Sequence, residues 1–361
     1  MVDEFDLEAL LAPISDEMPA GGDPRANFAA DSLYFGLRDA RAEARAVERQ
    51  ADAAGEENAP AAQWGPVLRL AVKLLATEAK DLEVASWCTE ALLRADGLAG
   101  LAAGFALMQE LVERYGEALH PMPDDEGMAR HVAPVTGLNG ESNDGTLIQP
   151  LRKLPLFQRP DGTAVPFWKY QQSVEAAGIG DLARREQRFA AGVIPFEQLE
   201  TEAAAASAAA FTRLHQDATA ANAAWQALAS ALDARAGKDA PPTSRVRDLL
   251  ADIAGIAARY APEGEIASAA TEEEPVVASS AVDLGDLGGI RTREEALRRL
   301  NEIAEFFRRT EPHSPLAYTL FEAVRRGRLT WPKLLEEIVP DADSRAGILR
   351  SLGIQPSSTS E

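Results

Sequence analysis

The side chains best suited to covalent or metal chemistry are scarce in this chain. It has one cysteine, Cys88, and four histidines that fall in separate parts of the sequence: His120, His131, His215 and His313. A structural zinc site usually takes four Cys or His ligands, and a catalytic Ser or Cys needs a base beside it. The sequence therefore predicts no metal site, and a Ser/His/Asp triad would need an accident of folding. A single cysteine also excludes an intrachain disulfide and suits a reducing cytosol.

Motifs for cofactor binding and catalysis are missing from the sequence as well. The chain has no Gly-x-Gly-x-x-Gly after a predicted strand, no phosphate-binding Gly-Lys-Ser/Thr loop, no Gly-x-Ser-x-Gly turn and no His-Glu-x-x-His pair. Cys88 lies one helical turn from Val84 and from Leu92 on an apolar helix face, which predicts a small buried hydrophobic residue. We therefore predict no catalytic residue, no cofactor and no enzymatic activity.

The charge balance limits the classes of partner. The 361 residues include 36 Lys and Arg against 57 Asp and Glu, a formal net charge of −21. A chain this acidic repels nucleic-acid phosphates and anionic membrane surfaces, so we predict no nucleic-acid partner. No uncharged apolar run approaches the ~20 residues that span a bilayer, and the start of the chain is acidic where a signal peptide is basic. We expect a cytoplasmic protein without direct membrane insertion, which reaches the inner membrane only through partners.

Helical periodicity is strongest between residues 64 and 116. Apolar residues recur at intervals of three and four along 67–75, 84–92 and 98–115, which predicts three amphipathic helices with short connections. Asp81 is suited to cap the second helix, and Asp96 with Gly97 should separate the second helix from the third. Two prolines just after residue 119 then end this block, because proline cannot continue a helix.

The remaining segments predict more helix and one short hairpin. Arginines interleaved with glutamates over 38–49 suggest a helix whose charged face is solvated. Residues 154–168 suggest a β-hairpin with its turn at Pro160, Asp161 and Gly162. A long Ala-rich helical stretch over 195–236 and a helix over 241–260 follow.

The predicted fold is mostly all-α: an N-terminal helical array with one short β-hairpin, long Ala-rich helices in the middle and a small C-terminal helical domain. Between about 261 and 289 aromatic residues vanish while Pro, Gly, Ser, Ala and Glu dominate, which is typical of a flexible linker. The predicted parts are the N-terminal helical domain (1–170), the Ala-rich middle region (171–260), the acidic linker (261–289), a three-helix oligomerisation domain (290–352) and a disordered tail (353–361).

The C-terminal segment 290–350 differs from the rest of the chain in charge and in size. It carries slightly more basic than acidic residues, so the net negative charge lies elsewhere. Its periodicity predicts three helices, the second with Ser314 as N-cap and Pro315 at the first helical position. A unit this small buries little surface alone, and exposed apolar residues such as Phe306 would gain from a neighbouring copy. We therefore expect this segment to self-associate.

Motifs at both ends of the chain resemble those of a known family. Four N-terminal stretches resemble the ImpA N-terminal domain: Leu10–Ser15 together with Pro19–Asp23, Lys80–Leu92, Leu119–Asp125 and Leu151–Leu156. The stretch Ala304–Tyr318 is similar to the C-terminal domain of the TssA proteins of the type VI secretion system. The motifs follow one another in the order that the family has, which makes the resemblance specific.

The resemblance implies a non-enzymatic structural and assembly component of a contractile, phage-tail-like machine. It implies a ring-shaped homo-oligomer formed through the C-terminal domain, and partners among the baseplate, sheath, inner tube and membrane complex of the secretion system. The residues that we expect to set the C-terminal fold and its interface are Phe306, Phe307, Arg308, Arg309, Glu311, Pro312, Ser314 and Pro315. The alternative is an acidic helical adaptor, unrelated to secretion, that recruits one basic partner through its negative surface.

Overall fold

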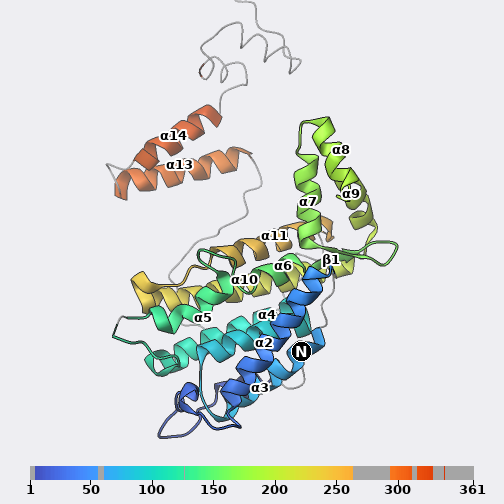
Figure 1. Cartoon of the computed structure of the whole chain (residues 1–361). Helices are drawn as coiled ribbons and strands as arrows, with labels where there is room; N and C mark the ends of the chain where they lie inside the picture. The colour runs from blue at the N-terminus through green and yellow to red at the C-terminus, as the bar shows by residue number, and fades with distance from the viewer. Residues whose placement is uncertain are drawn as a thin grey trace, which may run out of the picture. The chain divides into compact units, whose positions relative to one another are not determined.

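The structure is a computed structural model that describes residues 5–55, 61–125, 127–262, 293–310, 315–327 and 337. Within these ranges it is helical apart from one two-stranded antiparallel sheet, which confirms the predicted fold class (Figure 1). The chain divides into two compact units, Met1–Pro275 and Val276–Glu361. The first unit contains α1 (Leu7–Leu11), α2 (Leu33–Ala53), α3 (Gly65–Thr77), α4 (Leu82–Tyr115), α5 (Ala129–Asn139), α6 (Ile148–Arg152), β1 (Pro155–Gln158), β2 (Ala164–Pro166), α7 (Phe167–Ala177), α8 (Leu182–Ala190), α9 (Phe196–Ala205), α10 (Ala208–Ala236) and α11 (Ser244–Tyr260).

The long helix α4 is a pair of helices folded back on each other. Its backbone leaves helical geometry at Asp96 and Gly97, and Gly97 has a φ of +60°, which only glycine adopts at little cost. The second half then returns along the first, so that the Thr89 hydroxyl lies 3.4 Å from the Met108 sulfur. A Cβ at Gly104 would lie 2.6 Å from the same hydroxyl, so this glycine lets the two halves pack closely. The predicted break at Asp96 and Gly97 is confirmed.

The segment Leu82–Ala118 has the length and apolar composition of a membrane span, and among the described residues it is the one helix that does. It is interrupted at Gly97, however, and about half of its most apolar stretch is buried inside the unit. The predicted N-cap at Asp81 is confirmed, because its carboxylate accepts hydrogen bonds from the amides of Glu83 and Val84. The apolar composition of α4 therefore has its explanation in the core of this unit.

One hydrophobic core runs through the first unit, from Phe5 to Ala261. Helix α10 packs against both α4 and α11, and the ring of Trp225 on α10 lies 4.7 Å from that of Phe105 on α4. Both rings are fully buried. Side chains of the predicted N-terminal domain and of the predicted middle region thus share this core, and the division between them at residue 170 stays a prediction.

One sequence-based boundary needs correction. The hairpin of β1 and β2 is present, but Trp168, predicted to belong to it, lies in α7, because Pro166 ends the strand and precedes the helix. The predicted Ala-rich helical stretch over 195–236 is helical apart from a short break. It divides into α9 and α10, and the Ser207 hydroxyl caps α10 by accepting a hydrogen bond from the Ala210 amide.

The described part of the second unit contains α13 (Arg293–Thr310) and α14 (Pro315–Gly327), which pack against each other. Leu297 and Ala304 of α13 and Val324 of α14 are buried between the helices. Proline begins α14, as the sequence predicts. The third helix predicted from residue 331 onward lies outside the described residues, apart from Glu337.

Candidate protein-interaction site

Three of the N-terminal motifs that carry the resemblance meet at one end of α4. The Lys80 amide donates a hydrogen bond of 2.8 Å to the Ala20 carbonyl, and the His120 amide donates one of 3.1 Å to the Lys80 carbonyl. The Leu82 amide in turn donates to the His120 carbonyl, and His120 Nε2 lies 3.2 Å from the Gly21 carbonyl oxygen. Three stretches far apart in the sequence therefore form one rigid junction.

Lys80 joins the junction to α1 and α3 from inside. Its side chain is fully buried, and its ammonium group donates hydrogen bonds of 2.7 Å to the Leu10 carbonyl and 2.6 Å to the Leu75 carbonyl. Burial lowers the pKa of Lys80 to about 8, because a charged amine loses hydration inside a protein. The partners of this ammonium group are two peptide oxygens and no carboxylate, so Lys80 has a structural role and holds α1 and α3 together.

Arg25 binds the N-terminal turn of α4 through two carboxylates. Its Nη1 donates to Asp81 at 2.7 Å and its Nη2 donates to Glu83 at 2.6 Å, while the Tyr34 hydroxyl donates to Glu83 at 2.8 Å. Burial alone would lower the pKa of Arg25, but the bonds to Asp81 and Glu83 raise it above its ordinary value. Burial, together with the charge of Glu83, raises the pKa of Tyr34. The network therefore holds Arg25 charged and Tyr34 neutral.

A second arginine binds a carboxylate further along α4. Arg41 of α2 donates two hydrogen bonds to Glu90, at 2.5 and 2.9 Å, and Glu90 is fully buried. Burial raises the pKa of Glu90, but the hydrogen bonds and charge of Arg41 outweigh it and hold the pKa below its usual value. Beside this pair, Arg94 and the Trp64 indole both donate to Glu48. These pairs fix α2 against α4.

Four aromatic rings form a row from the core to the surface, and we call them the aromatic row. Trp87 lies 5.6 Å from Tyr34, Tyr34 lies 5.4 Å from Phe35, and Phe35 lies 5.9 Å from Phe28. Trp87 is buried, whereas Phe28 is 84% exposed. Each of the first three rings carries an arginine over its face: Arg41 over Trp87 (5.2 Å), Arg25 over Tyr34 (5.0 Å) and Arg38 over Phe35 (4.9 Å).

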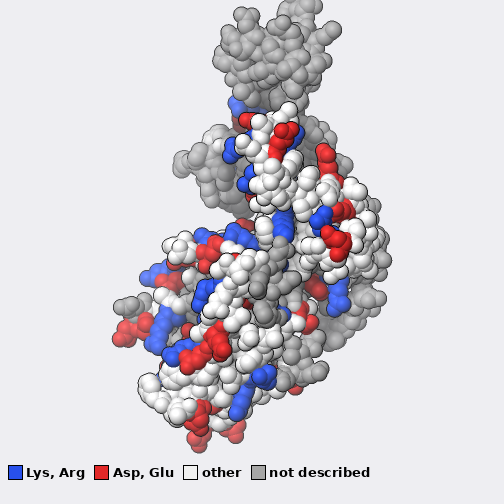
Figure 2. All heavy atoms as spheres, turned by 45° about the vertical axis from the view of Figure 1, so that its right-hand side comes forward, with Lys and Arg blue, Asp and Glu red and all other residues white. Residues whose placement is uncertain are grey.

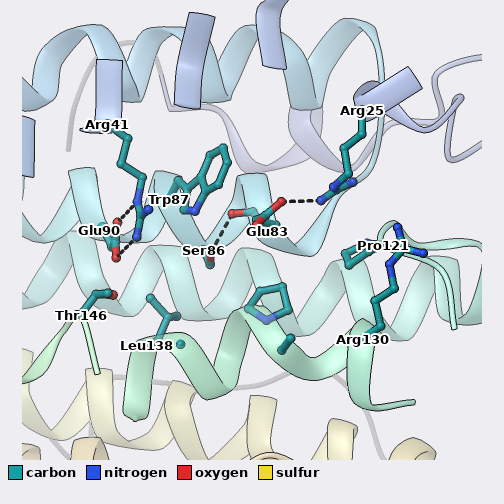
Figure 3. Close-up of a pocket in the computed structure, with 13 residues that line it drawn as sticks. Arg25, Arg41, Glu83, Ser86, Trp87, Glu90, Pro121, Arg130, Leu138 and Thr146 are labelled. Carbon is teal, nitrogen blue, oxygen red and sulfur yellow. Dashed lines mark hydrogen bonds and ion pairs between the residues drawn. The ribbon is translucent and has the colours of Figure 1, made fainter. Parts of the chain in front are cut away.

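A cavity of about 340 Å³ opens beside the aromatic row, and we call it the polar cleft. Figure 3 shows Arg25 and Pro121 near one end, Arg41 and Thr146 at the other, and α5 along the side opposite Trp87. The full lining is Arg25, Arg41, Glu83, Ser86, Trp87, Glu90, Pro121, Arg130, Ala133, Pro134, Gly137, Leu138 and Thr146. Arg130 is exposed and makes no ion pair or side-chain hydrogen bond with any residue that the structure describes.

The chemistry of the polar cleft is that of recognition. In the described part of the chain, no three His, Cys, Asp or Glu side chains are grouped so that they could hold a metal ion. The Nδ1 of the nearby His131 donates a hydrogen bond of 2.8 Å to the Pro121 carbonyl oxygen. Burial raises the pKa of the Cys88 thiol to about 12, which keeps this thiol protonated. Guanidinium groups and aromatic faces are the groups that protein interfaces favour.

The predicted C-terminal residues are only partly within the described chain. Arg308 lies with its guanidinium 5.6 Å from the Phe321 ring and bonds to Glu305, Phe307 is partly buried, and Arg309 is exposed. Phe306 and Pro315 belong to α13 and α14, but their side chains lie outside the described residues, as do Glu311, Pro312 and Ser314. Their role in an interface therefore stays a prediction.

Sequence reasoning missed the residues of the polar cleft. It placed the arginines of 38–49 on a solvated face, and for Arg41 this was wrong, because Arg41 turns inward to Glu90. The only signal for Glu90 is its position three residues after Trp87 and next to Ala91, on the face of α4 that the core covers. A carboxylate at an apolar position indicates that a cation must come from another element.

Comparisons with known proteins agree with the motifs. A family model described as ImpA, N-terminal, type VI secretion system, matches residues 11–140, which include every residue of the polar cleft except Thr146. The chain is also 28% identical to the type VI secretion system component TssA1 of Pseudomonas aeruginosa, over 96% of this chain and 98% of that protein. The chain is thus similar to a TssA protein over nearly its whole length, and residues 11–140 match the ImpA N-terminal family. A solved structure, the N-terminal domain including the conserved ImpA_N region of the TssA component from Burkholderia cenocepacia, matches with a TM-score of 0.58 at 28% identity, over 72% of this chain and 96% of that one.

Proposed function

We propose that this chain is a non-enzymatic structural and assembly component of a type VI secretion system. The observation that carries the proposal is the extent of the match to TssA1, which spans nearly the whole of both proteins. A match of that extent includes both the N-terminal region and the C-terminal helices, so it supports the same domain organisation as in TssA1. It does not favour the alternative of an adaptor unrelated to secretion.

The proposal includes a ring-shaped homo-oligomer held together by the C-terminal domain. Its support is the pair α13 and α14, which leaves Ile303 45% and Tyr318 69% exposed. Apolar side chains of this size on a small helical unit gain free energy when another copy covers them. A ring would present several copies of the first unit together, which turns weak contacts with baseplate, sheath, inner tube or membrane complex into avid ones. The proposed location is the cytoplasm.

Deleting residues 290–361 tests the oligomer. The truncated chain should keep a helical circular dichroism spectrum, because the core of the first unit ends at Ala261, but its mass in sedimentation should fall to a low-order species. A chain shortened only by residues 353–361 is the matched control and should keep the mass of the full chain. Equal masses for the full and the truncated chain would refute the ring.

Secretion tests the wider proposal. Cells without this protein should no longer release the inner-tube protein of the apparatus into the medium, and the full chain supplied from a plasmid should restore the release. Undiminished release from the deletion strain would show that the chain is no part of the machine.

A further inference from the structure

We propose that the polar cleft and the aromatic row together form a docking site for an acidic, partly apolar segment of another protein of the secretion apparatus. This inference rests on the proposed function and adds to it a surface and the chemistry of the partner. The partner segment would place a carboxylate against Arg130 and apolar side chains against Phe28 and Met122.

The apolar part of this surface lies on the loops beside the polar cleft. Phe28 is 84%, Met18 54% and Met122 45% exposed, and these are three of the six large apolar side chains exposed in the described part of the first unit. Met122 follows Pro121, which lines the cleft, and Phe28 continues the row that begins at Trp87 in the cleft wall. Contact of these apolar side chains with water is costly, and a partner that covers them removes that cost.

The turn that carries Met18 has a fixed backbone. The Met18 amide donates to the Ser15 hydroxyl at 3.0 Å, and the Met18 carbonyl accepts from the Gly21 amide at 2.9 Å. Gly21 itself has a φ of +72° and would place a Cβ 2.1 Å from the Glu78 carbonyl oxygen, so this turn requires glycine. A surface held in one conformation loses little entropy when it binds a partner, which favours recognition.

The charged part of the surface includes arginines that have no ion pair with a described residue. Arg130 lines the cleft and lies at the end near Pro121 (Figure 3). Arg45 does not line the cleft; it follows Arg41 by one turn of α2, is half-buried and likewise has no ion pair with a described residue. Burial and the repulsion of Arg41 lower the pKa of Arg45, which is the effect of positive charge that neighbouring carboxylates do not balance. An incoming carboxylate would supply that balance.

The partner that these features favour is a protein segment, not a nucleic acid or a lipid surface. Arg25 and Arg41 in the cleft already pair with Glu83 and Glu90, so the cleft offers no continuous row of free cations to a row of phosphates. Basic and acidic side chains are also interleaved on the face that Figure 2 shows, with no extended basic area. An acidic residue next to apolar ones satisfies both the arginines and the exposed rings, and arginine, methionine and aromatic residues are enriched where proteins bind one another.

The experiment uses the full chain and the double variant Phe28→Ser/Arg130→Glu. Both side chains are exposed, so the variant should keep the circular dichroism spectrum and the oligomeric mass of the wild type. Each cytoplasmic component of the apparatus is produced singly, and its binding to the immobilised chain is measured by interferometry. We expect one component to bind the wild type and to lose at least tenfold in affinity with the double variant.

The matched control is Leu182→Ser/Arg184→Glu on α8, which also changes an exposed apolar residue and an arginine that has no ion pair with a described residue. It should bind like the wild type, and changing one acidic residue of the partner to lysine should restore binding to Arg130→Glu. The proposal fails if no component binds the wild type, if both double variants bind equally, or if the effect falls on self-association or on binding to anionic vesicles or DNA. The oligomeric mass and the secretion assay test the proposed function separately, so the two failures are distinguishable.

Discussion

Two arginine–glutamate pairs of this protein have the same chemistry and opposite surroundings. Arg41 and Glu90 are 49 residues apart, belong to different helices and form a bidentate bond around a fully buried carboxylate. Arg325 and Glu322 are three residues apart on α14 and remain largely exposed. Helical spacing reveals the second pair in the sequence and hides the first. The difference teaches that the pair with the weaker sequence signal is the one in which removal of a single partner costs more free energy.

The reason lies in the alternative that each group has when its partner is removed. An exposed carboxylate returns to water, and salt screens whatever attraction it had. A buried carboxylate without its cation keeps its charge in a medium that solvates it poorly. Variants that remove one partner at a time therefore test whether the two pairs differ in this way.

The largest effect on stability is expected when the buried carboxylate of Glu90 loses its partner. Replacing Arg41 by methionine should lower the free energy of unfolding by about 3–5 kcal/mol, since the change leaves the Glu90 charge buried and unpaired. The double variant Arg41→Met/Glu90→Leu should recover most of that loss, because it removes both charges. Urea denaturation followed by circular dichroism measures both values. If the loss in the double variant equals the sum of the losses from Arg41→Met and from Glu90→Leu, the two groups do not act as a pair.

An intermediate effect, dependent on pH, is expected from Lys80. Its pKa is about 8 in the folded chain against 10.5 ordinarily, so between these values the unfolded chain binds the proton that the folded chain has lost. The free energy of unfolding should therefore rise with pH across this window. Lys80→Met should reduce the rise, which urea denaturation at pH 7.5 and pH 9.5 would detect. The same slope in both proteins would show that Lys80 is charged throughout.

The smallest effect is expected from Glu322. Hydrogen bonds from Arg325 lower the pKa of Glu322 to about 2, yet the pair is exposed and screened by salt. Glu322→Gln should leave the amide hydrogen exchange of α14 peptides unchanged at physiological salt. Faster exchange that persists at high salt would place this pair in the same class as Arg41 and Glu90.

Periodicity predicted the helices whose apolar faces repeat clearly. The break at Gly97 and the cap at Asp81 were also predictable, because both depend on the local conformation of one or two residues. The division between α9 and α10 was not, since alanine fits a helix on either side of Ser207 and gives no periodic signal there.

The polar cleft was beyond the reach of sequence reasoning for a different reason. Its side chains come from α2, α4, α5 and the segments before α2, after α4 and after α5, and only the fold brings Arg25 to Glu83 or Arg41 to Glu90. Long-range pairs of this kind leave no fixed spacing in the chain. The motifs of the resemblance include Glu83, Trp87, Glu90 and Pro121, but the other half of the cleft, with Arg25, Arg41 and Arg130, lies outside them.

The fold-back of α4 bears on how the chain is made. Thr89 meets Gly104 only fifteen residues later, so closing this contact costs little conformational entropy. The hairpin can therefore collapse while the ribosome is still synthesising the segments that become α10 and α11. The later helices would then pack against a hairpin that has already formed, and their packing would cover apolar side chains of α4 that are exposed in the nascent chain.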